Sequence, residues 1–187
     1  NHMDRIQRNM LKMIFKKEEM ALKGVSKIGL ERFSDERGRI VNMFDCEQFS
    51  KFKIDKLTRS KKNVLRGLHG DTTNDKLIYC LQGKFHLVII NYDKTSAQYL
   101  EKIQIDMSED SDFAVFVPRN FLNGHYCLSE TCLFYYKWSE SYVSPDKQFS
   151  ILWNDKDLNI KWPLLESEPI LSLRDKTSKT LEEIKNE

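Results

Sequence analysis

The sequence predicts an all-β domain built as an antiparallel sandwich or barrel. Between residues 64 and 138, short apolar runs alternate with turn residues at regular spacing, which is typical of such folds. Helical spacing of apolar residues returns only near the C-terminus. At 187 residues the chain is long enough for one domain with a substantial core and too short to favour two.

Composition excludes several classes of function. Charged residues make up 31% of the chain and the net charge is only +2, so we expect no nucleic-acid partner. No apolar run approaches the roughly 18 residues that a membrane span needs, which predicts a soluble protein. The four cysteines form no C-x-x-C pair and no cleavable apolar leader precedes them. We expect a reducing, cytoplasmic setting, with Cys46, Cys80, Cys127 and Cys132 as small core residues.

The N-terminal segment leaves two alternatives open. Asn1-His2-Met3 resembles a cloning remnant and is set aside. Within residues 4–24, helical spacing of apolar side chains competes with a short strand and turn over residues 13–19; the helical positions are Ile6, Met10, Leu11 and Ile14. We expect residues 1–22 to form an N-terminal extension and residues 23–187 a single domain.

The strands follow in order. Residues 33–41 place a polar turn with Gly38 before a β-branched pair, which predicts a hairpin or a bulge entering a strand. Residues 77–81 and 85–90, joined through Gly83, predict a second hairpin. Further strands are expected at residues 97–105, 113–117, 126–128 and 132–138. The strand at residues 113–117 is expected to end at Pro118. Thr180 and Glu183 have capping-box spacing and predict a short C-terminal helix.

The stretch from Asn63 to Asp71 concentrates chemically useful side chains, namely Arg66, His69 and Asp71. Val64 and Leu65 suggest the end of a buried strand. Strand alternation then places Arg66 with Leu68 on one face and Gly67 with His69 on the other. Two interpretations of His69 remain open here: a group lining a cavity, or a core histidine bound to a backbone carbonyl.

A barrel of this size encloses a pocket, and its candidate polar lining residues are His69, Lys76, His125, Tyr136 and Tyr142. Tyr136 fits equally well as a core tyrosine whose hydroxyl donates to a backbone carbonyl. Arg37 is either an anion ligand or a solvated turn charge. A metal site is the other alternative, because the spacing of His69, Asp71, Asp75 and His125 is similar to that of ligands for iron, manganese or zinc in small β-barrels. Asp71, however, stands where such sites usually have a second histidine.

Several separated motifs resemble, in order and spacing, those of the dTDP-4-dehydrorhamnose 3,5-epimerase family, over residues 23–177. They are Asp35-Glu36-Arg37-Gly38, Arg66-Gly67-Leu68-His69, Phe134-Tyr135-Tyr136-Lys137, Trp153-Asn154-Asp155 with Ile160-Lys161-Trp162-Pro163, and Leu171-Ser172-Leu173-Arg174-Asp175. The resemblance implies a cupin jelly-roll barrel with a few short, mainly C-terminal helices. It also implies a homodimer that exchanges N-terminal strands, no metal, no cofactor, and nucleotide-linked 4-keto-6-deoxy sugars as substrates.

The resemblance also implies roles for individual residues. His69 matches the base and Asp175 its carboxylate partner, while Tyr136 matches the acid on the opposite face of the sugar. Lys76 matches a lysine near the C4 oxygen, where a cation stabilises a developing enolate.

Three further residues match positions near the nucleotide. Arg66 and Arg37 correspond to arginines at the diphosphate end, where a forked guanidinium suits phosphate oxygens. Tyr142 corresponds to an aromatic side chain close to the sugar and diphosphate.

Departures from the family pattern bear on the substrate. Asn42, Ile54 and Lys56 replace the polar residues that surround thymine, and Ile54 offers no side-chain hydrogen bond. Asn123 replaces a second histidine. These differences are closer to a branch that epimerises GDP-linked 4-keto-6-deoxy-heptoses for bacterial capsules, so a GDP-sugar is favoured. The further substrate-binding candidates are Lys56, Asn123, His125 and Asp71.

Three hypotheses follow. The first is an epimerase that needs no cofactor and inverts C3, C5 or both of a nucleotide 4-keto sugar. The second is a metal-dependent cupin enzyme using His69, Asp71 and His125. The third is a cupin that binds a nucleotide sugar without catalysis, since sequence alone does not bring His69, Tyr136 and Asp175 together.

Overall fold

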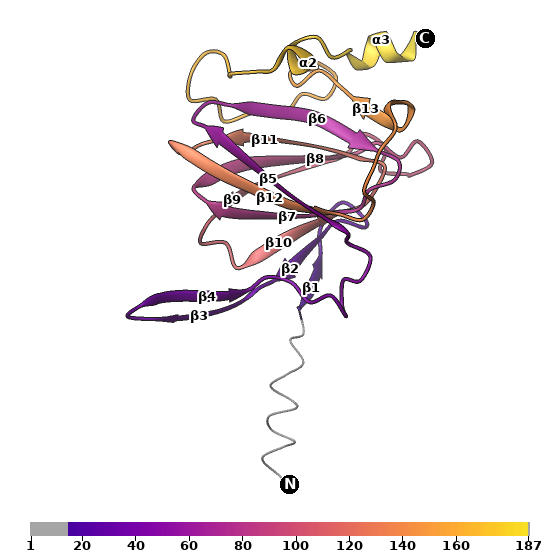
Figure 1. The fold of residues 1–187 in the computed structure, drawn as a ribbon. Helices are drawn as coiled ribbons and strands as arrows, with labels where there is room; N and C mark the ends of the chain where they lie inside the picture. Colours follow the sequence, from indigo (N-terminus) through magenta and orange to yellow (C-terminus); the bar gives the residue numbers. More distant parts are fainter. Residues whose placement is uncertain (1–14, 187) are drawn as a thin grey trace.

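Two antiparallel sheets face each other in the computed structural model, which describes residues 15–186 (Figure 1). The six-stranded sheet contains, in spatial order, β1 (Lys17–Glu19), β2 (Ser26–Gly29), β10 (Phe113–Val117), β7 (Lys76–Gln82), β12 (Thr131–Trp138) and β5 (Ile54–Lys61). The five-stranded sheet contains β13 (Gln148–Ser150), β6 (Leu65–Asp71), β11 (Phe121–Cys127), β8 (Lys84–Asn91) and β9 (Lys102–Ser108). The predicted all-β, two-sheet fold is confirmed.

The remaining elements are short. β3 (Glu31–Asp35) and β4 (Gly38–Asn42) form the predicted hairpin, which projects from the barrel in Figure 1. A 3₁₀ turn, η1, spans Pro145–Lys147, and two C-terminal helices are α2 (Leu173–Lys176) and α3 (Leu181–Lys185). The predicted capping box of Thr180 and Glu183 is present at the start of α3. Among residues 15–186, no helix has the length and apolar character needed to cross a membrane.

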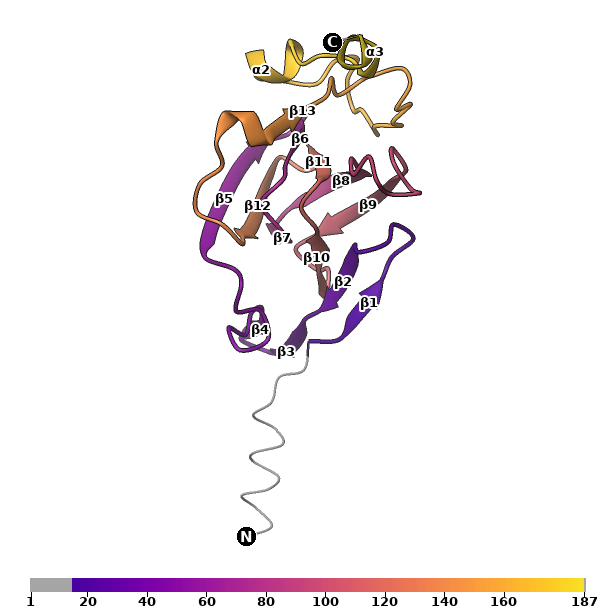
Figure 2. The ribbon, with the colours of Figure 1, turned by 90° about the vertical axis from the view of Figure 1, so that its right-hand side faces the viewer.

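The main core lies between the two sheets, because their inward-facing apolar side chains pack together. Both sheets contribute to it, for example Ile78 and Phe134 from one sheet and Leu87 and Ile89 from the other. A second cluster covers the outer face of the five-stranded sheet, where the C-terminal segment contributes Leu158 and Leu181. The C-terminal segment that carries α2 and α3 thus covers the outer face of the five-stranded sheet (Figure 2).

Residues 15–22 pack into this domain. β1 pairs with β2, and Leu22, which is 1% exposed, belongs to the main core. This part of the expected N-terminal extension is therefore structurally continuous with the barrel, since an apolar side chain gains more by joining the core than by staying in solvent. The alternative helix positions at Ile6, Met10, Leu11 and Ile14 lie outside the described residues.

The expected hairpin through Gly83 is wrong. β7 pairs with β10 and β12, whereas β8 pairs with β9 and β11, so the turn at Gly83 carries the chain from one sheet to the other. Gly83 has a φ of +72°, and an added Cβ would lie 2.1 Å from the Thr131 carbonyl oxygen. A glycine turn between two apolar runs has the same sequence pattern in a hairpin and in such a corner.

The cysteines are not all core residues. Cys127 and Cys132 are buried and Cys80 is half-buried, as expected for small apolar side chains, but Cys46 is exposed. Cys46 lies in the connection between β4 and β5, which runs over the surface of the six-stranded sheet.

Candidate active site

A cavity formed by two adjoining hollows contains most of the predicted site residues. The hollows have volumes of about 430 Å³ and 260 Å³ and share His69, Lys76, Tyr136 and Trp138. The Lys56 hollow is further lined by Lys56, Gly70, Asp71, Ser141, Tyr142, Val143, Gln148 and Arg174. The Arg66 hollow is further lined by Thr58, Arg66, Asn123, His125, Phe134, Ser172 and Asp175.

His69, which lines both hollows, pairs with Asp175 at the wall of the Arg66 hollow. His69 Nε2 lies 2.7 Å from Asp175 Oδ1, and His69 Nδ1 has no hydrogen-bond partner among the described residues. Asp175 is 3% exposed; burial raises its pKa, but the hydrogen bond and charge of His69 outweigh burial and leave the pKa below its ordinary value. A carboxylate that stays ionised fixes the imidazole tautomer and stabilises an imidazolium, so His69 is equipped to act as a base.

The chain brings this pair together through backbone contacts at the start of β6. Ile170 bridges Val64 in parallel, and its carbonyl accepts a hydrogen bond of 3.0 Å from the Leu65 N–H. Two residues further on, the Ser172 side chain caps α2 by accepting from the Asp175 N–H at 3.1 Å. The cap orients the first turn of α2, and that turn delivers Asp175 to His69.

Arg66 and His69 both face the cavity, so the predicted alternation is wrong. β6 begins rather than ends at Leu65, and it contains one extra residue opposite β11: Arg66 pairs with His125 and His69 with Asn123. Such a bulge shifts the side-chain alternation by one position. Gly67 accommodates it with a φ of +140°, and an added Cβ would lie 2.6 Å from Gly124 Cα. The Arg66 Nε donates to Ser60 Oγ at 3.0 Å.

Tyr136 and Lys76 come from the opposite sheet. Tyr136 is on β12, where Phe134 and Tyr136 turn toward the main core, as predicted for one aromatic of each adjacent pair. Burial raises the pKa of Tyr136, which keeps its phenol protonated at neutral pH. Lys76 is 6% exposed and donates to Asn123 Oδ1 at 2.9 Å. Burial lowers the pKa of Lys76 to about 8, so its ammonium remains largely charged near pH 7.

His125 is buried and uncharged. Its ring stacks on Phe134 with centroids 4.1 Å apart, and burial, reinforced by the charge of Arg66, lowers its pKa to about 3. Its Nε2 has no hydrogen-bond partner among the described residues. His125 therefore presents a neutral imidazole to the Arg66 hollow, which suits hydrogen bonding and not proton donation at neutral pH.

Lys56 and Tyr142 border the Lys56 hollow. The Lys56 Nζ lies 3.3 Å from the centroid of the Trp138 ring, a cation–π arrangement. Burial lowers the pKa of Lys56, and the charge of Asp71 opposes that shift. Tyr142 is 74% exposed and stands at the rim of the hollow.

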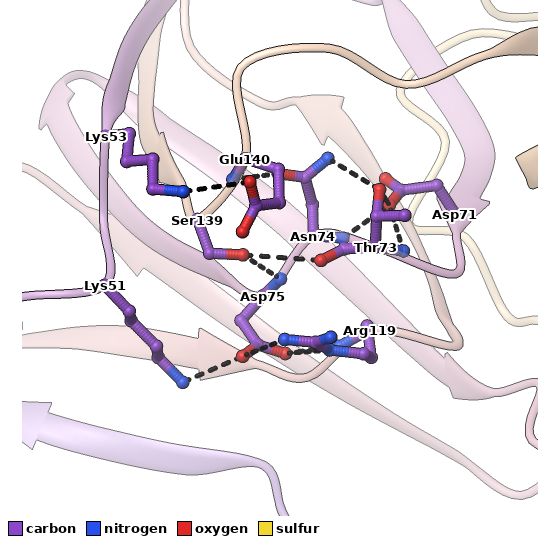
Figure 3. Close-up of polar contacts among 9 residues, drawn as sticks. All are labelled: Lys51, Lys53, Asp71, Thr73, Asn74, Asp75, Arg119, Ser139 and Glu140. Atoms are coloured by element: carbon purple, nitrogen blue, oxygen red, sulfur yellow. Dashed lines mark hydrogen bonds and ion pairs between the residues drawn. The ribbon is translucent and has the colours of Figure 1, made fainter.

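Asp71 and Asp75 are engaged by protein groups (Figure 3). Asp71 Oδ1 accepts hydrogen bonds from the Thr73 N–H, the Thr73 hydroxyl and the Asn74 N–H at 2.9, 3.0 and 2.6 Å. Asp75 pairs with Lys51 at 2.8 Å and accepts from the Arg119 N–H at 2.8 Å. Within residues 15–186, no three His, Cys, Asp or Glu side chains converge to hold a metal ion, so the metal-site alternative has no donor set in the described chain.

Arg37 is the predicted site residue that the fold does not bring to the cavity of its own chain. It stands at the turn between β3 and β4, where its guanidinium pairs with Asp35 at 2.5 Å and its side chain is 83% exposed. The hairpin projects away from the barrel (Figure 1). All other predicted catalytic and binding residues line the two hollows.

Sequence reasoning did not single out several lining residues, among them Trp138, Arg174, Thr58 and Ser172. Trp138 underlies Lys56 and ends the aromatic run of β12, and Arg174 adjoins Asp175, so both lie in or beside quoted motifs. Thr58 and Ser172 also line the Arg66 hollow. Their residue types carry no chemical signal in sequence, because threonine and serine are common on strands and at helix starts.

A family model described as dTDP-4-dehydrorhamnose 3,5-epimerase matches residues 19–183 of the chain. Among characterised relatives, the dTDP-4-dehydrorhamnose 3,5-epimerase of Salmonella typhimurium is 33% identical over 161 residues, which cover 81% of this chain and 87% of the relative. The enzyme of the same description from Methanothermobacter thermautotrophicus is 31% identical, with 87% of this chain and 92% of the relative covered.

Solved structures give the same result. The dTDP-4-dehydrorhamnose 3,5-epimerase of Elizabethkingia anophelis superposes with a TM-score of 0.81 at 29% identity, covering 90% of this chain and 97% of that one. The dTDP-6-deoxy-D-glucose-3,5-epimerase of Legionella pneumophila, solved in complex with dTDP-4-keto-L-rhamnose, superposes with a TM-score of 0.82 at 28% identity, covering 89% and 93%.

Proposed function

The chain belongs to the dTDP-4-dehydrorhamnose 3,5-epimerase family and is a carbohydrate-acting isomerase, and we propose that it inverts C3, C5 or both of a nucleotide-linked 4-keto-6-deoxy sugar by proton transfer alone. The observation that carries this proposal is the cavity wall arrangement: the His69–Asp175 pair comes from one side and Tyr136 from the opposite sheet. Inversion needs two proton carriers on opposite faces of the same carbon.

The chemistry follows from the ketone at C4. The ketone acidifies the hydrogens on C3 and C5, so His69 removes one of them as a proton and the electron pair of the broken C–H bond forms an enolate. Lys76 stabilises the negative charge that develops on the C4 oxygen in a site shielded from water. Tyr136 then donates its phenolic proton to the opposite face of the carbon, which restores the ketone with inverted configuration.

We propose that a GDP-linked sugar, a hexose or a heptose, is the preferred substrate, and that the product enters surface polysaccharide such as capsule. By the family resemblance, Ile54 and Lys56, at the start of β5, stand where the family has polar partners of thymine. Arg66, held by Ser60, and Lys56 supply positive charge for the diphosphate. The second candidate is a dTDP-linked substrate, favoured by the Legionella pneumophila relative in complex with dTDP-4-keto-L-rhamnose.

We also propose a homodimer in a reducing, cytoplasmic setting. The β3–β4 hairpin projects from the barrel with Phe33 and Ile40 exposed, which supports its packing on a second copy. In such a dimer Arg37 would reach the partner's cavity instead of its own. The four free cysteines support a reducing compartment.

Deuterium uptake tests the reaction and the nucleotide together. The enzyme is incubated in deuterated water with a panel of GDP- and dTDP-linked 4-keto-6-deoxy sugars, and NMR follows C3 and C5. We expect deuterium at one or both carbons, fastest with a GDP-sugar. Fastest exchange with a dTDP-sugar would favour the second candidate, and no exchange with any member would contradict the epimerase. Stoichiometric metal by elemental analysis, with exchange lost on chelation, would favour a metal-dependent cupin.

A further inference from the structure

Three charged side chains meet in the Lys56 hollow, each from a different strand. Lys56 comes from β5, Asp71 from the last position of β6 and Lys76 from the first position of β7. Asp71 is 4% exposed and Lys76 6% exposed. A buried carboxylate that lines the same hollow as two ammonium groups influences their charge, because interactions between charges strengthen as water is excluded.

The connection between β6 and β7 holds the Asp71 carboxylate in place (Figure 3). Its Oδ1 accepts three hydrogen bonds from Thr73 and Asn74. Asn74 Oδ1 in turn accepts from the Glu140 N–H at 2.8 Å, and the Asp75 N–H donates to Ser139 Oγ at 3.0 Å. The connection is therefore fastened to the end of β12, and Asp71 cannot swing away from the two lysines without breaking these bonds.

We propose that Asp71 is a positioning residue that keeps the Lys76 ammonium charged where the substrate ketone would bind, in opposition to Lys56. The role of Lys76 in catalysis rests on the proposed function; the effect of Asp71 on Lys76 does not.

The electrostatics of the cavity agree with this geometry. Burial lowers the pKa of Lys76 to about 8; the charge of Asp71 works against this shift and that of Lys56 adds to it. Lys76 donates to the neutral Asn123. The other titratable or charged groups that face the two hollows are His69, Tyr136, Tyr142, Arg174, Arg66, His125 and Asp175. A pKa so close to neutrality makes the charge of Lys76 sensitive to either neighbour.

The direct test measures the titration of Lys76 in the substrate-free protein by NMR of labelled lysine side chains, with the signal assigned by its loss in Lys76→Met. We expect Asp71→Asn to lower the pKa of Lys76 by about one unit and Lys56→Gln to raise it. Thr73→Ala is the matched control, because it removes one hydrogen bond to Asp71 and leaves every charge in place. We expect this control to titrate as the wild type does.

An unchanged Lys76 titration in Asp71→Asn would overturn the proposal. Should Asp71→Asn fail to fold, Lys56→Gln provides the test. If the pKa of Lys76 does not rise in Lys56→Gln, the proposal is overturned as well. The alkaline limb of kcat/KM for deuterium exchange should move in the same directions as the NMR pKa. Failure of the proposed function looks different: the wild type would exchange no carbon-bound hydrogen, while the lysine titrations would still respond to both substitutions.

Discussion

At the scale of residues, the proposed proton transfers depend on the protonation of individual side chains in the cavity. Asp175 lies against His69 Nε2, and the buried Nδ1 has no hydrogen-bond partner among the described residues. Tyr136 keeps its proton because burial raises its pKa, and Lys76 keeps its charge although burial lowers its pKa. His125 stays neutral because burial lowers its pKa. The cavity thus combines the proposed base, acid and cation.

Replacing Tyr136 by Phe separates proton removal from inversion. The phenylalanine keeps the ring contacts with Phe134 and Trp138 but cannot donate a proton. Because His69 still forms the enolate, we expect inversion to fall by about 10²-fold or more while deuterium exchange with retained configuration falls much less. NMR of product configuration and deuterium content measures both. Equal losses of inversion and exchange would argue against Tyr136 as the acid.

Residue types were predictable from sequence, but their convergence was not. The motifs indicated His69, Tyr136 and Asp175, and the structure places all three along one hollow. Their meeting depends on the pairing of Ile170 with Val64, and a backbone contact between residues so far apart leaves no local pattern. Lys56 and Asp71 show the same limit, since their effect on Lys76 comes from three strands meeting at one hollow.

At the scale of elements, the bulge in β6 decides where side chains point. The strands and the β3–β4 hairpin follow from turn residues and apolar runs, and most were predictable. The extra residue between Arg66 and His69 was not, because a bulge depends on the partner strand β11. The corner at Gly83 was not predictable for a similar reason: the partners of β7 and β8 lie in different sheets, and the turn residues alone do not determine those partners.

Substituting Gly67 by Ala tests the bulge. Its φ is +140° and the new Cβ would lie 2.6 Å from Gly124 Cα, so we expect a loss of about 2 kcal/mol or more in the free energy of unfolding. Gly38→Ala is a suitable control, since Gly38 has a φ of +125° but no heavy atom within 4 Å of the new Cβ. It should lose only about 1 kcal/mol from backbone strain. Urea denaturation compares the two, and equal losses would contradict the steric account.

At the scale of the whole molecule, the cavity lies between side chains of both sheets. The β3–β4 hairpin projects from the barrel (Figure 1). The predicted fold class is confirmed, and residues 15–22 pack into the barrel through β1 and Leu22. Arg37 lies outside the cavity: its motif resembles that of a nucleotide-binding arginine, yet it pairs with Asp35 on the projecting hairpin. Sequence could not show this, because a motif does not say where the fold places its side chains.

Complementation tests whether Arg37 serves the partner's cavity. Arg37→Ala and His69→Asn are each expected to be nearly inactive. In a mixed dimer, the cavity of the Arg37→Ala subunit retains His69 and receives the intact Arg37 of the His69→Asn subunit. We therefore expect refolding the two variants together to restore a substantial part of the exchange activity. No recovery, with a dimer shown by light scattering, would contradict the exchange of Arg37 between copies.

The central claim, that His69 removes a carbon-bound proton, is tested most directly by deuterium uptake in His69→Asn. With the panel substrate that the wild type exchanges fastest, we expect exchange at both C3 and C5 to fall by about 10³-fold, because no other described group replaces the base. His86→Asn is the matched control: His86 also pairs with a carboxylate, Asp106, at 2.7 Å, but on the β8 and β9 strands and outside the cavity. The control should exchange as the wild type does. Exchange at the wild-type rate in His69→Asn would contradict the account.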